Sequence, residues 1–477
     1  MSNDPLRIHL SLVSHTNIGK TTLARTLLSR DIGEVADRAH VTETTDDYVL
    51  ARTPEGCELI LWDTPGFGNS VALAKRLEGR ANPVGWFLSE VWDRMANKSL
   101  WLNQKALKHV KETSSVVLYL VNATELPDSA PYVRAEMRIL EWIGKPVIVL
   151  LNQIGQPKPP EAEQADVERW KQAMAAYPIV SSVLSMDAFA RCWVQEYALF
   201  KAIEKVLPEE LQSTFDALQE IWSRKRRAEY SASVQALAHY LEKVSNDQEV
   251  AETTSVKDQI KLLGKRLGLF RNEIITDPIG AAQTALASRA ADEFCALTDK
   301  LISINALKGK GVRKELLNRM QSDWKITSSV PVTPATVAGA VGTGAAGGIA
   351  TDLVTGGLSM GLGTLLGTVV GALGGAGLAV AYNRTKGISG TVVTWSNIAL
   401  NNFLVDAVLL YLAVAHFGRG RGNWSKSEYP SHWSNVIHEI IKNNSEMSHT
   451  TINQIDYIIK NTLEILYKNN FFDKYCK

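Results

Sequence analysis

Apolar runs and helix-spaced patterns alternate along the first 207 residues of the chain. Runs that predict strands lie at Ile8–Val13, Tyr48–Ala51, Cys57–Trp62, Ser115–Val121, Pro146–Leu151 and Pro178–Leu184. Helix patterns lie at Thr22–Leu28, Ala130–Ile143 and Trp193–Val206. Strands that alternate with helices predict an α/β fold with a mostly parallel sheet and helices on both faces.

From Glu209 the pattern becomes helical. Apolar residues keep a spacing of three and four at Phe215, Leu218, Trp222, Tyr230, Val234, Leu237 and Leu241, and again at Val256, Ile260, Leu263, Leu267 and Phe270. These stripes predict a helical bundle, and a stalk used for self-association would show the same pattern. We interpret the basic cluster Arg224–Arg227 as a solvated helix face; phosphate or lipid headgroups are the alternative.

The segment from Ile326 to Tyr382 contains one charged residue, Asp352, and is dense in Gly, Ala, Val, Leu and Thr. Each side of Asp352 exceeds the roughly 20 residues that span a bilayer. Glycines recur at four-residue steps, which lets two helices approach closely, and basic residues flank both ends. The pattern predicts a Gly-rich apolar hairpin of two membrane-inserting helices, with a soluble hairpin of close-packed small residues as the alternative.

A second apolar stretch, Phe403–Phe417, is interrupted by Asp406 and predicts a buried helix rather than a membrane span. The chain from Asn435 to Lys477 is rich in Asn, Ile, Lys and Tyr, and predicts helices such as Ile452–Leu466. We therefore expect four segments: an α/β domain at 1–207, a helical bundle or stalk at 208–325, the apolar hairpin at 326–383, and a C-terminal helical region with a variable tail at 384–477.

Charge and cysteine content narrow the class of protein. Lys and Arg number 51 and Asp and Glu 50, a net charge of +1, so no bulk electrostatic attraction to nucleic acid is expected. The 4 cysteines show no pair or metal-ligand spacing, which is typical of a reducing compartment. No basic segment followed by an apolar run is present at the N-terminus, so we expect the protein to begin in the cytosol.

Between the first strand and the first helix, the run Ser14–Thr21 fits the phosphate-binding spacing G-x-x-x-x-G-K-[ST], with Ser14 in place of the first glycine. Gly19 lets the backbone wrap a polyphosphate, Lys20 supplies a charge to the β- and γ-phosphates, and the Thr21 hydroxyl is a ligand for Mg²⁺. A second motif, Asp63–Gly66, follows a predicted strand directly. Asp63 would contact the metal and the Gly66 N–H would sense the γ-phosphate, so the two motifs together predict an NTP-binding P-loop domain.

A threonine before the strand Tyr48–Ala51 would close over Mg²⁺ as a first switch. We expect Thr45 in this role, with Thr44 as the next choice. The predicted catalytic residues are Lys20 and Thr45, and the predicted metal ligands are Thr21, Thr45 and Asp63.

The two motifs resemble those of bacterial GTPases of the Era and TrmE type. The run Asp31–Arg38 resembles more closely bacterial proteins that join such a GTPase to a C-terminal domain of unknown function (number 3482), and the similarity extends over residues 6 to about 430. This resemblance implies a P-loop GTPase with GTP and Mg²⁺ as ligands. It also implies that Asn17 is a candidate ligand for a monovalent cation such as K⁺.

Two positions bear on the hydrolysis rate and on base specificity. Phe67 follows Gly66 where Ras-like enzymes place a water-positioning glutamine, so we expect slow intrinsic hydrolysis unless a partner, a cation or self-association completes the site. The run Asn152–Gly155 stands where the resemblance places Asn-Lys-x-Asp, and Gly155 offers no carboxylate to guanine, which leaves guanine specificity open. Ser185 and Met186 would form the last base-contacting loop. The predicted nucleotide-contacting residues are Ser14, Asn17, Ile18, Gly19, Lys20, Thr21, Thr22, Asp63, Gly66, Asn152, Gln153 and Ser185.

The leading functional hypothesis is a slowly hydrolysing GTP switch coupled to a helical module at the cytoplasmic side of the inner membrane; a cytoplasmic location is the alternative. Membrane lipid and a second copy of the chain are candidate partners, and no nucleic acid is expected. Two other hypotheses remain open: a membrane-perturbing effector gated by the nucleotide domain, and a pseudo-GTPase scaffold.

Overall fold

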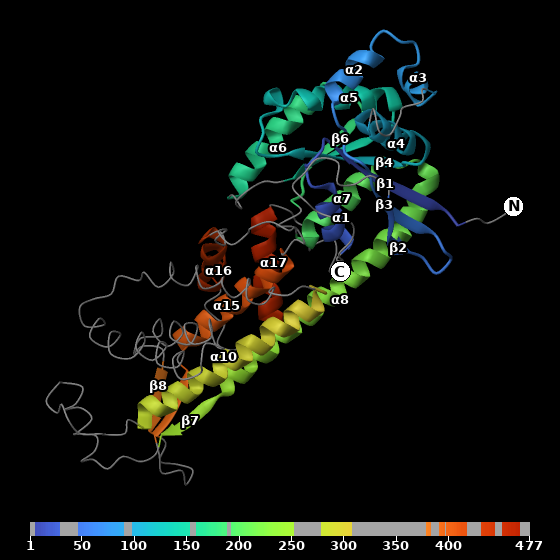
Figure 1. Cartoon of the computed structure of the whole chain (residues 1–477). Helices are drawn as coiled ribbons and strands as arrows, with labels where there is room; N and C mark the ends of the chain where they lie inside the picture. The colour runs from blue at the N-terminus through green and yellow to red at the C-terminus, as the bar shows by residue number, and fades with distance from the viewer. Residues whose placement is uncertain are drawn as a thin grey trace.

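The structure is a computed structural model, and it describes residues 5–28, 46–89, 98–152, 159–187, 192–251, 278–307, 378–382, 391–395, 397–416, 431–443 and 451–467. In Figure 1 a large sheet with its helices occupies one end of the molecule, a small sheet lies at the opposite end, and two long helices, α8 and α10, run between them.

The large sheet has six strands in the order β2-β3-β1-β4-β5-β6. Their bounds are β1 Arg7–Ser14, β2 Asp46–Arg52, β3 Glu58–Asp63, β4 Val116–Asn122, β5 Val147–Asn152 and β6 Val180–Ser185. Only the β2–β3 pair is antiparallel among the described pairs of this sheet. The mostly parallel sheet predicted from the apolar runs is therefore confirmed.

The central strands β4 and β5 are buried on both faces, and successive residues of each strand point to opposite sides of the sheet. In β4, Val116, Leu118 and Leu120 belong to one apolar cluster, which we call the α8-side core. Val117 and Tyr119 belong to the opposite cluster with residues of α2, α3, α4, α5 and α6, and we call this the α5-side core. The helices are α1 Lys20–Leu28, α2 Ser70–Leu77, α3 Pro83–Ser89, α4 Lys98–Glu112, α5 Pro131–Ile143, α6 Pro160–Met174 and α7 Trp193–Glu204, with a short 3-10 turn η1 at Pro127–Ser129.

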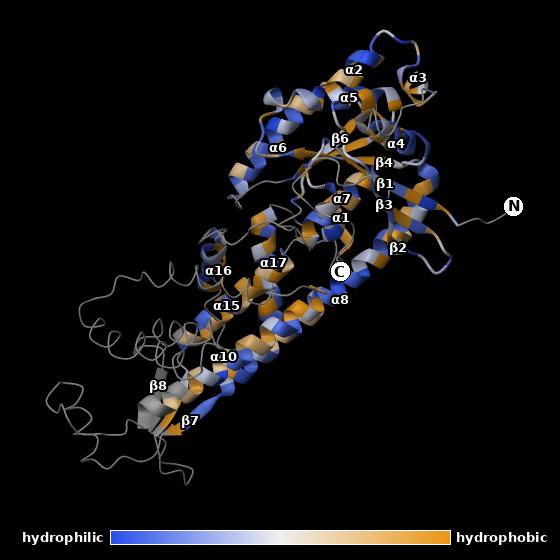
Figure 2. Cartoon of the chain, in the orientation of Figure 1, coloured by the Kyte–Doolittle hydropathy of each residue, from blue (hydrophilic) through white to orange (hydrophobic). Residues whose placement is uncertain are grey.

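The helix α8, Glu209–Asn246, is 38 residues long and takes part in two cores. Its first part places Phe215, Leu218 and Trp222 in the α8-side core of the sheet. Its second part, from Tyr230 to Val244, belongs to a third core in the C-terminal region. Hydrophobic and hydrophilic residues alternate around α8 in Figure 2, as the three- and four-residue spacing predicts. The helix thus joins the two ends of the molecule.

The C-terminal region packs four further helices with α8: α10 Pro278–Ile304, α15 Asn397–Ala415, α16 Ser431–Asn443 and α17 Ile452–Tyr467. Three short antiparallel strands, β7 Gln248–Ala251, β8 Leu378–Tyr382 and β9 Thr391–Trp395, form a sheet in the order β7-β9-β8. The helical character predicted for the C-terminal region is confirmed, and α15 is the buried helix expected from the stretch 403–417. The second predicted stripe, Val256 to Phe270, lies outside the described residues.

The end of the Gly-rich segment differs from the prediction. Leu378–Tyr382 was expected to lie in a membrane-inserting helix, but it forms strand β8. This strand is antiparallel to β9, with Leu378 opposite Trp395 and Tyr382 opposite Thr391. The helical expectation is wrong for these five residues because their backbone groups pair with a neighbouring strand. Residues 326–377 lie outside the described part, so the rest of the predicted hairpin stays a prediction.

Among the described helices, none has the length and apolar character that crossing a membrane requires. The predicted domain boundaries also stay a prediction. The described residues on either side of the Gly-rich segment nevertheless share one core: Tyr230, Phe294 and Phe403 all belong to it.

Candidate nucleotide-binding site

The phosphate-binding loop connects the end of β1 at Ser14 to the start of α1 at Lys20. Two residues between them have left-handed backbone angles, Asn17 with φ 65° and Gly19 with φ 95°. Asparagine and glycine are the residues that adopt this conformation most readily. Ser14 does not need a positive φ, which explains how a serine replaces the glycine of the usual pattern.

Lys20 crosses the inside of this loop and is only 7% exposed. Its ammonium donates to Ser14 Oγ at 3.0 Å and to the His15 carbonyl oxygen at 3.5 Å, and the Ser14 hydroxyl donates to the same carbonyl at 2.6 Å. Burial lowers the pKa of Lys20, while the charges of Asp63 and Glu136 oppose that shift. The serine therefore supplies an oxygen that holds the cation over the loop.

Thr21 and Asp63 meet from two different elements, since Thr21 lies in the first turn of α1 and Asp63 at the end of β3. The Thr21 hydroxyl donates to Asp63 Oδ2 at 2.5 Å. Burial raises the pKa of Asp63 to about 6, and the hydrogen bond from Thr21 and the charge of Lys20 oppose the rise. The second oxygen, Asp63 Oδ1, is buried without a hydrogen-bond partner among the described residues.

These two oxygen-bearing side chains fit a magnesium ion. Mg²⁺ prefers oxygen ligands and is usually held by one or two protein groups together with water and phosphate oxygens. The described part of the chain contains no group of three or more His, Cys, Asp and Glu residues that could hold a metal by themselves. Thr21 and Asp63 would thus supply two protein ligands, and water and phosphate oxygens would complete the coordination of Mg²⁺.

The segment after Asp63 is docked on the phosphate-binding loop. The Phe67 N–H donates to the Ser14 carbonyl oxygen at 2.9 Å, and the Asn103 side chain of α4 bonds both the N–H and the carbonyl of Gly68. A Cβ on Gly66 would lie 2.9 Å from Lys20 Nζ and 3.0 Å from Thr16 Cα. The close approach explains why glycine stands at this position.

The Phe67 side chain is completely buried in the α5-side core. It therefore points away from the loop that would bind the phosphates. Since a phenyl ring also has no polar atom, the side chain after Gly66 cannot orient a water molecule.

On the base-binding side, the structure brings together Asn152 at the end of β5 and Ser185 at the end of β6. Asn152 is buried, and its Nδ2 donates to the Ile18 carbonyl oxygen of the phosphate-binding loop at 2.6 Å. The strands pair in parallel with Leu151 beside Ser185. Ile18 and Thr22 are also buried next to the loop glycine. Of the predicted contacts, Thr45 and Gln153 lie outside the described residues, as do Thr44 and Gly155.

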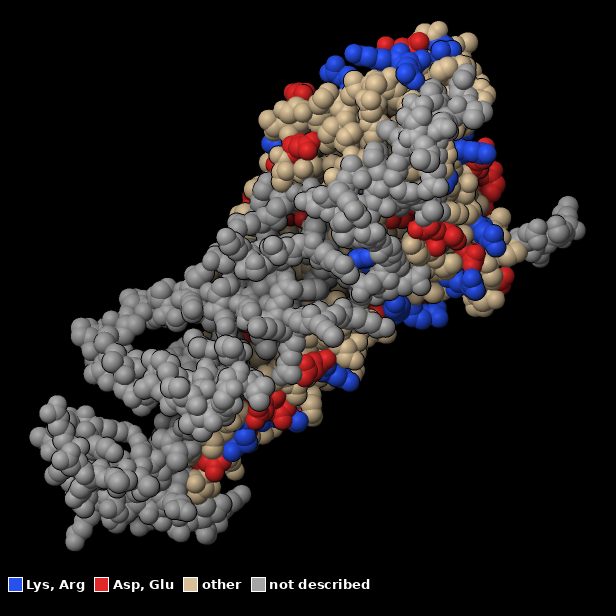
Figure 3. All heavy atoms as spheres, in the orientation of Figure 1, with Lys and Arg blue, Asp and Glu red and all other residues tan. Residues whose placement is uncertain are grey.

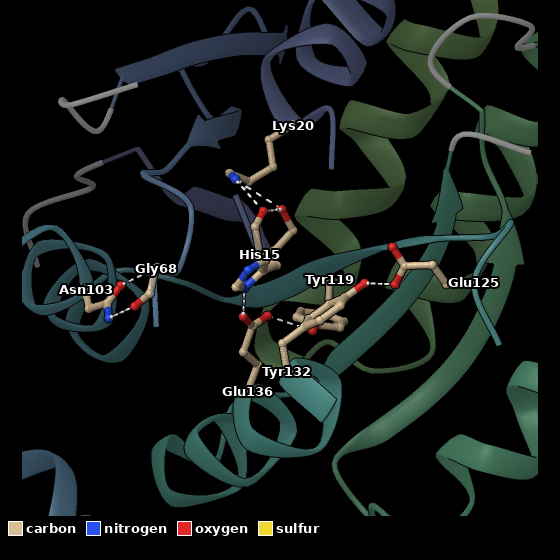
Figure 4. A network of polar contacts seen from close by, with 9 residues as sticks. His15, Lys20, Gly68, Asn103, Tyr119, Glu125, Tyr132 and Glu136 are labelled. Carbon is tan, nitrogen blue, oxygen red and sulfur yellow. Dashed lines mark hydrogen bonds and ion pairs between the residues drawn. The ribbon is translucent and has the colours of Figure 1, made fainter. Parts of the chain in front are cut away.

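Sequence reasoning missed a polar network beneath the phosphate-binding loop, which Figure 4 shows. His15 Nδ1 lies 2.8 Å from Oε1 of the fully buried Glu136 on α5, and the Tyr119 hydroxyl donates to Glu136 Oε2 at 2.7 Å. The His15 ring stacks on Tyr132, with ring centroids 4.6 Å apart. A glutamate beside the apolar face of the predicted helix 130–143 was the signal that could have revealed it.

The base-binding side is also joined to the C-terminal helices. Trp193, the first residue of α7, donates its indole N–H to the Tyr411 hydroxyl of α15 at 3.2 Å. Arg226 of α8 forms an ion pair at 3.0 Å with Glu196 of α7, and these side chains are only 12% and 1% exposed. Arg226 was expected on a solvated helix face; it is largely buried instead, because Glu196 and Glu229 both lie within reach of its guanidinium.

Two family models match parts of the chain. Residues 9–153 match the model described as 50S ribosome-binding GTPase, and residues 323–456 match a domain of unknown function, DUF3482. The two matches follow one another in the order that the sequence resemblance implies.

Comparison with solved structures finds Era in complex with MgGDPNP and nucleotides 1506–1542 of 16S ribosomal RNA, at 19% identity and a TM-score of 0.32. A variant of Aquifex aeolicus Era bound to GDP and AlF4⁻ has 21% identity and a TM-score of 0.32. Each alignment covers 43% of this chain and 58% of the Era chain, so the chain spans less than two thirds of either Era structure. A probable GTP-binding protein engB has 14% identity and a TM-score of 0.28, with coverage of 41% of this chain and 99% of that one.

Proposed function

We propose that this chain, an Era-like GTPase domain joined to a C-terminal DUF3482 domain, is a GTP-driven switch whose nucleotide state is transmitted to the helical region. The GTPase domain itself follows from the family match over residues 9–153. One observation carries the site: Lys20, Thr21, Asp63 and Gly66 come from two separate motifs and converge on one loop.

Each of these residues has a role that its environment supports. When GTP binds, the Lys20 ammonium exchanges its hydrogen bond to Ser14 Oγ for one to a phosphate oxygen. A charged acceptor thereby replaces a neutral one. Gly66 presents its backbone beside the Lys20 ammonium, where a γ-phosphate would lie. A bound Mg²⁺ supplies charge to the transferred phosphoryl group. Thr21 and Asp63 orient the site around it, with Thr45 proposed as the residue that closes from the first switch.

The contacts between the sheet and the helices support transmission. Strand β2 begins at Asp46, directly after the proposed switch threonine, and α8 packs against β2 and β3. Leu50 of β2 packs against the α8-side core, to which Phe215 and Trp222 of α8 belong. A shift of β2 between nucleotide states therefore changes the surface on which α8 rests. A ligand shifts such an equilibrium only by its differential affinity for the two states.

Slow hydrolysis is part of this proposal. The supporting observation is the burial of Phe67, which leaves no polar side chain at the position that orients water in Ras-like enzymes. We propose that K⁺ near Asn17, a partner, or self-association completes the site. The left-handed backbone of Asn17 lies within the loop, where a monovalent cation would lie beside the phosphates.

We further propose attachment to the cytoplasmic side of the inner membrane through residues 326–377, with lipid as a partner. The support is compositional: this stretch contains Asp352 as its one charged residue. Along α8, acidic and basic residues alternate in Figure 3, with ion pairs such as Arg227–Glu220. Because the described residues along α8 mix both signs of charge instead of forming a basic stripe, we propose no nucleic-acid partner, although the Era structure above contains 16S ribosomal RNA.

The test is a titration of the full chain with labelled GTP, GDP and ATP in Mg²⁺, once in K⁺ and once in Na⁺. Phosphate release is then followed with and without liposomes. Preference for GTP, with turnover raised by K⁺ or liposomes, is the expected result. Tight GTP binding without turnover under every condition would instead favour the pseudo-GTPase scaffold.

The same liposomes, filled with a self-quenching dye, separate an anchor from a membrane-perturbing effector. An anchored switch sediments with the vesicles and releases no dye. Dye release that depends on GTP would favour the gated effector. A protein that does not sediment with the vesicles would contradict the proposed membrane attachment.

A further inference from the structure

The base-binding side of the site lacks the carboxylate that the resembled pattern provides, because Gly155 stands at that position. We infer that Glu163, in the first turn of α6, is the residue that recognises the N1–H and the amino group of guanine. The inference rests on the proposed GTP-binding function and names the residue that determines its base specificity.

A hydrogen bond between two separate elements places Glu163 at the site. The Ser185 hydroxyl, at the end of β6, donates to Glu163 Oε1 on α6. Helix α6 packs against β6, and Glu163 is half-buried in the first turn of the helix. The carboxylate is therefore held by the loop that sequence analysis assigned to the base.

Ser185 in turn connects the carboxylate to the phosphate-binding loop. It lies beside Leu151 in the parallel pairing of β5 and β6, and the next residue of β5, Asn152, bonds the Ile18 carbonyl oxygen at 2.6 Å. The Met186 N–H also bonds the Leu151 carbonyl oxygen at 2.9 Å. Glu163, Ser185 and Asn152 therefore occupy the same edge of the sheet as the loop that would hold the phosphates.

The chemistry of a carboxylate suits guanine in particular. The two oxygens of a carboxylate accept about four hydrogen bonds in total, which is enough to receive two adjacent donors of a base together with the Ser185 hydroxyl. Guanine presents two adjacent donors, N1–H and the 2-amino group, whereas adenine presents a bare N1 acceptor and xanthine an oxygen at position 2. Buried polar groups left unpaired by the wrong base make such a site strongly selective. The first turn of a helix also favours the ionised carboxylate.

The decisive variant is Glu163→Gln in the full chain, with GTP, XTP and ATP competing for the Mg²⁺-bound protein. A glutamine amide accepts from N1–H and donates to the xanthine oxygen, while it opposes the guanine amino group with its own N–H. We expect GTP affinity to fall about 100-fold and XTP affinity to rise by a similar factor. A gain of XTP binding cannot come from unfolding.

Glu161→Gln is the matched control, because Glu161 is an acidic residue of the same helical turn but is exposed. It should leave both affinities within about 2-fold of the wild type. Ser185→Ala should weaken GTP binding about 10-fold without a gain for XTP, because it removes the donor that holds the carboxylate.

Unchanged GTP preference in Glu163→Gln would overturn the inference. An equal loss for all three nucleotides would also overturn it, since it would mean that Glu163 only supports Ser185. If the wild-type chain itself binds no guanine nucleotide, the proposed function fails, and that result is distinct because it precedes any substitution.

Discussion

The two sides of the nucleotide site are built differently. On the phosphate-binding side, Ser14 to Thr21 form one continuous loop, and Asp63 lies on the neighbouring strand β3. On the base-binding side, Asn152, Glu163 and Ser185 come from three elements, β5, α6 and β6. The first arrangement uses mostly backbone groups and consecutive residues, and the second uses side chains that meet only after folding.

This difference indicates which substitutions each side of the site tolerates. A loop that binds phosphate through N–H groups depends on backbone angles, so its glycines and its Lys-Thr pair stand at fixed spacings. A base needs only one carboxylate at the right place, and more than one element can supply it. The departure of Gly155 from the resembled pattern therefore need not remove base recognition, whereas an uncharged residue at position 20 would remove the charge that contacts the phosphates.

The largest effect is expected where the base-binding side joins α8. Arg226→Ala removes the ion-pair partner of the buried Glu196 carboxylate, and removal of one partner of a buried ion pair costs about 3–5 kcal/mol of folding free energy. Urea unfolding of the variant measures this loss. Arg227→Ala is the control, because its exposed pair with Glu220 contributes at most about 1 kcal/mol. Equal losses of folding free energy in the two variants would show that the Arg226–Glu196 pair contributes no more to stability than an exposed ion pair.

Lys20→Ala tests the phosphate-binding side. Loss of the ammonium should weaken GTP binding about 100-fold, as expected for a hydrogen bond to a charged group, and it should weaken GTP, XTP and ATP alike. Competition between the three nucleotides measures both the loss of affinity and whether that loss is equal for the three bases. The equal loss contrasts with Glu163→Gln, which should change the ranking of the bases. A Lys20→Ala protein that keeps full affinity would refute the site.

A smaller effect is expected from Gly66→Ala. The added Cβ would lie 3.0 Å from the Thr16 backbone, so the segment after Asp63 must move away from the loop. We expect phosphate release to slow roughly 10-fold in single-turnover assays while GTP affinity is retained. Val71→Ala, at an exposed position of α2, serves as the control. An unchanged rate would mean that this segment does not contact the γ-phosphate.

The last prediction concerns pH, and its effect is absent at neutral pH. Burial, followed by the charge of His9, lowers the pKa of His109 to about 4, below the usual value of 6.5. Between pH 6.5 and pH 4 the His109 imidazole is therefore protonated in the unfolded chain but neutral in the folded chain. The free energy of unfolding consequently decreases as the pH falls from 6.5 towards 4. His109→Gln should flatten the acid side of the stability profile, as urea unfolding between pH 4 and pH 7 would show. A profile parallel to that of the wild type would contradict this assignment.

Much of the α/β half was predictable because strands that are buried on both faces of a sheet appear in the sequence as continuous apolar runs. The continuous apolar run in β5, for example, is fully buried in the structure. The Gly-rich segment was harder, because Leu378–Tyr382 has the composition of a helix but pairs with β9. Composition does not specify which distant strand is available as a partner, and tertiary context overrides it.

Site prediction shows the same limit. Lys20, Thr21 and Asp63 could be proposed from the sequence because each stands at a fixed offset from a strand end, whereas the contacts of His15, Glu136 and Glu163 could not be anticipated. Glu136 lies 121 residues from His15, and Glu163 lies 22 residues from Ser185. No spacing rule connects such pairs, because the intervening chain can follow many paths.

The sequence by itself therefore determined the strands of the large sheet, the order of the two phosphate motifs and the candidate residues for phosphate and metal, since these depend on local backbone geometry and on which faces are buried. Only the tertiary structure decided that Phe67 is buried, that Arg226 pairs with Glu196, that β8 completes a sheet, and that Ser185 holds a carboxylate from α6. The physical reason is that hydrogen bonds and ion pairs between distant residues depend on the packing of whole elements, which no short stretch of the chain encodes.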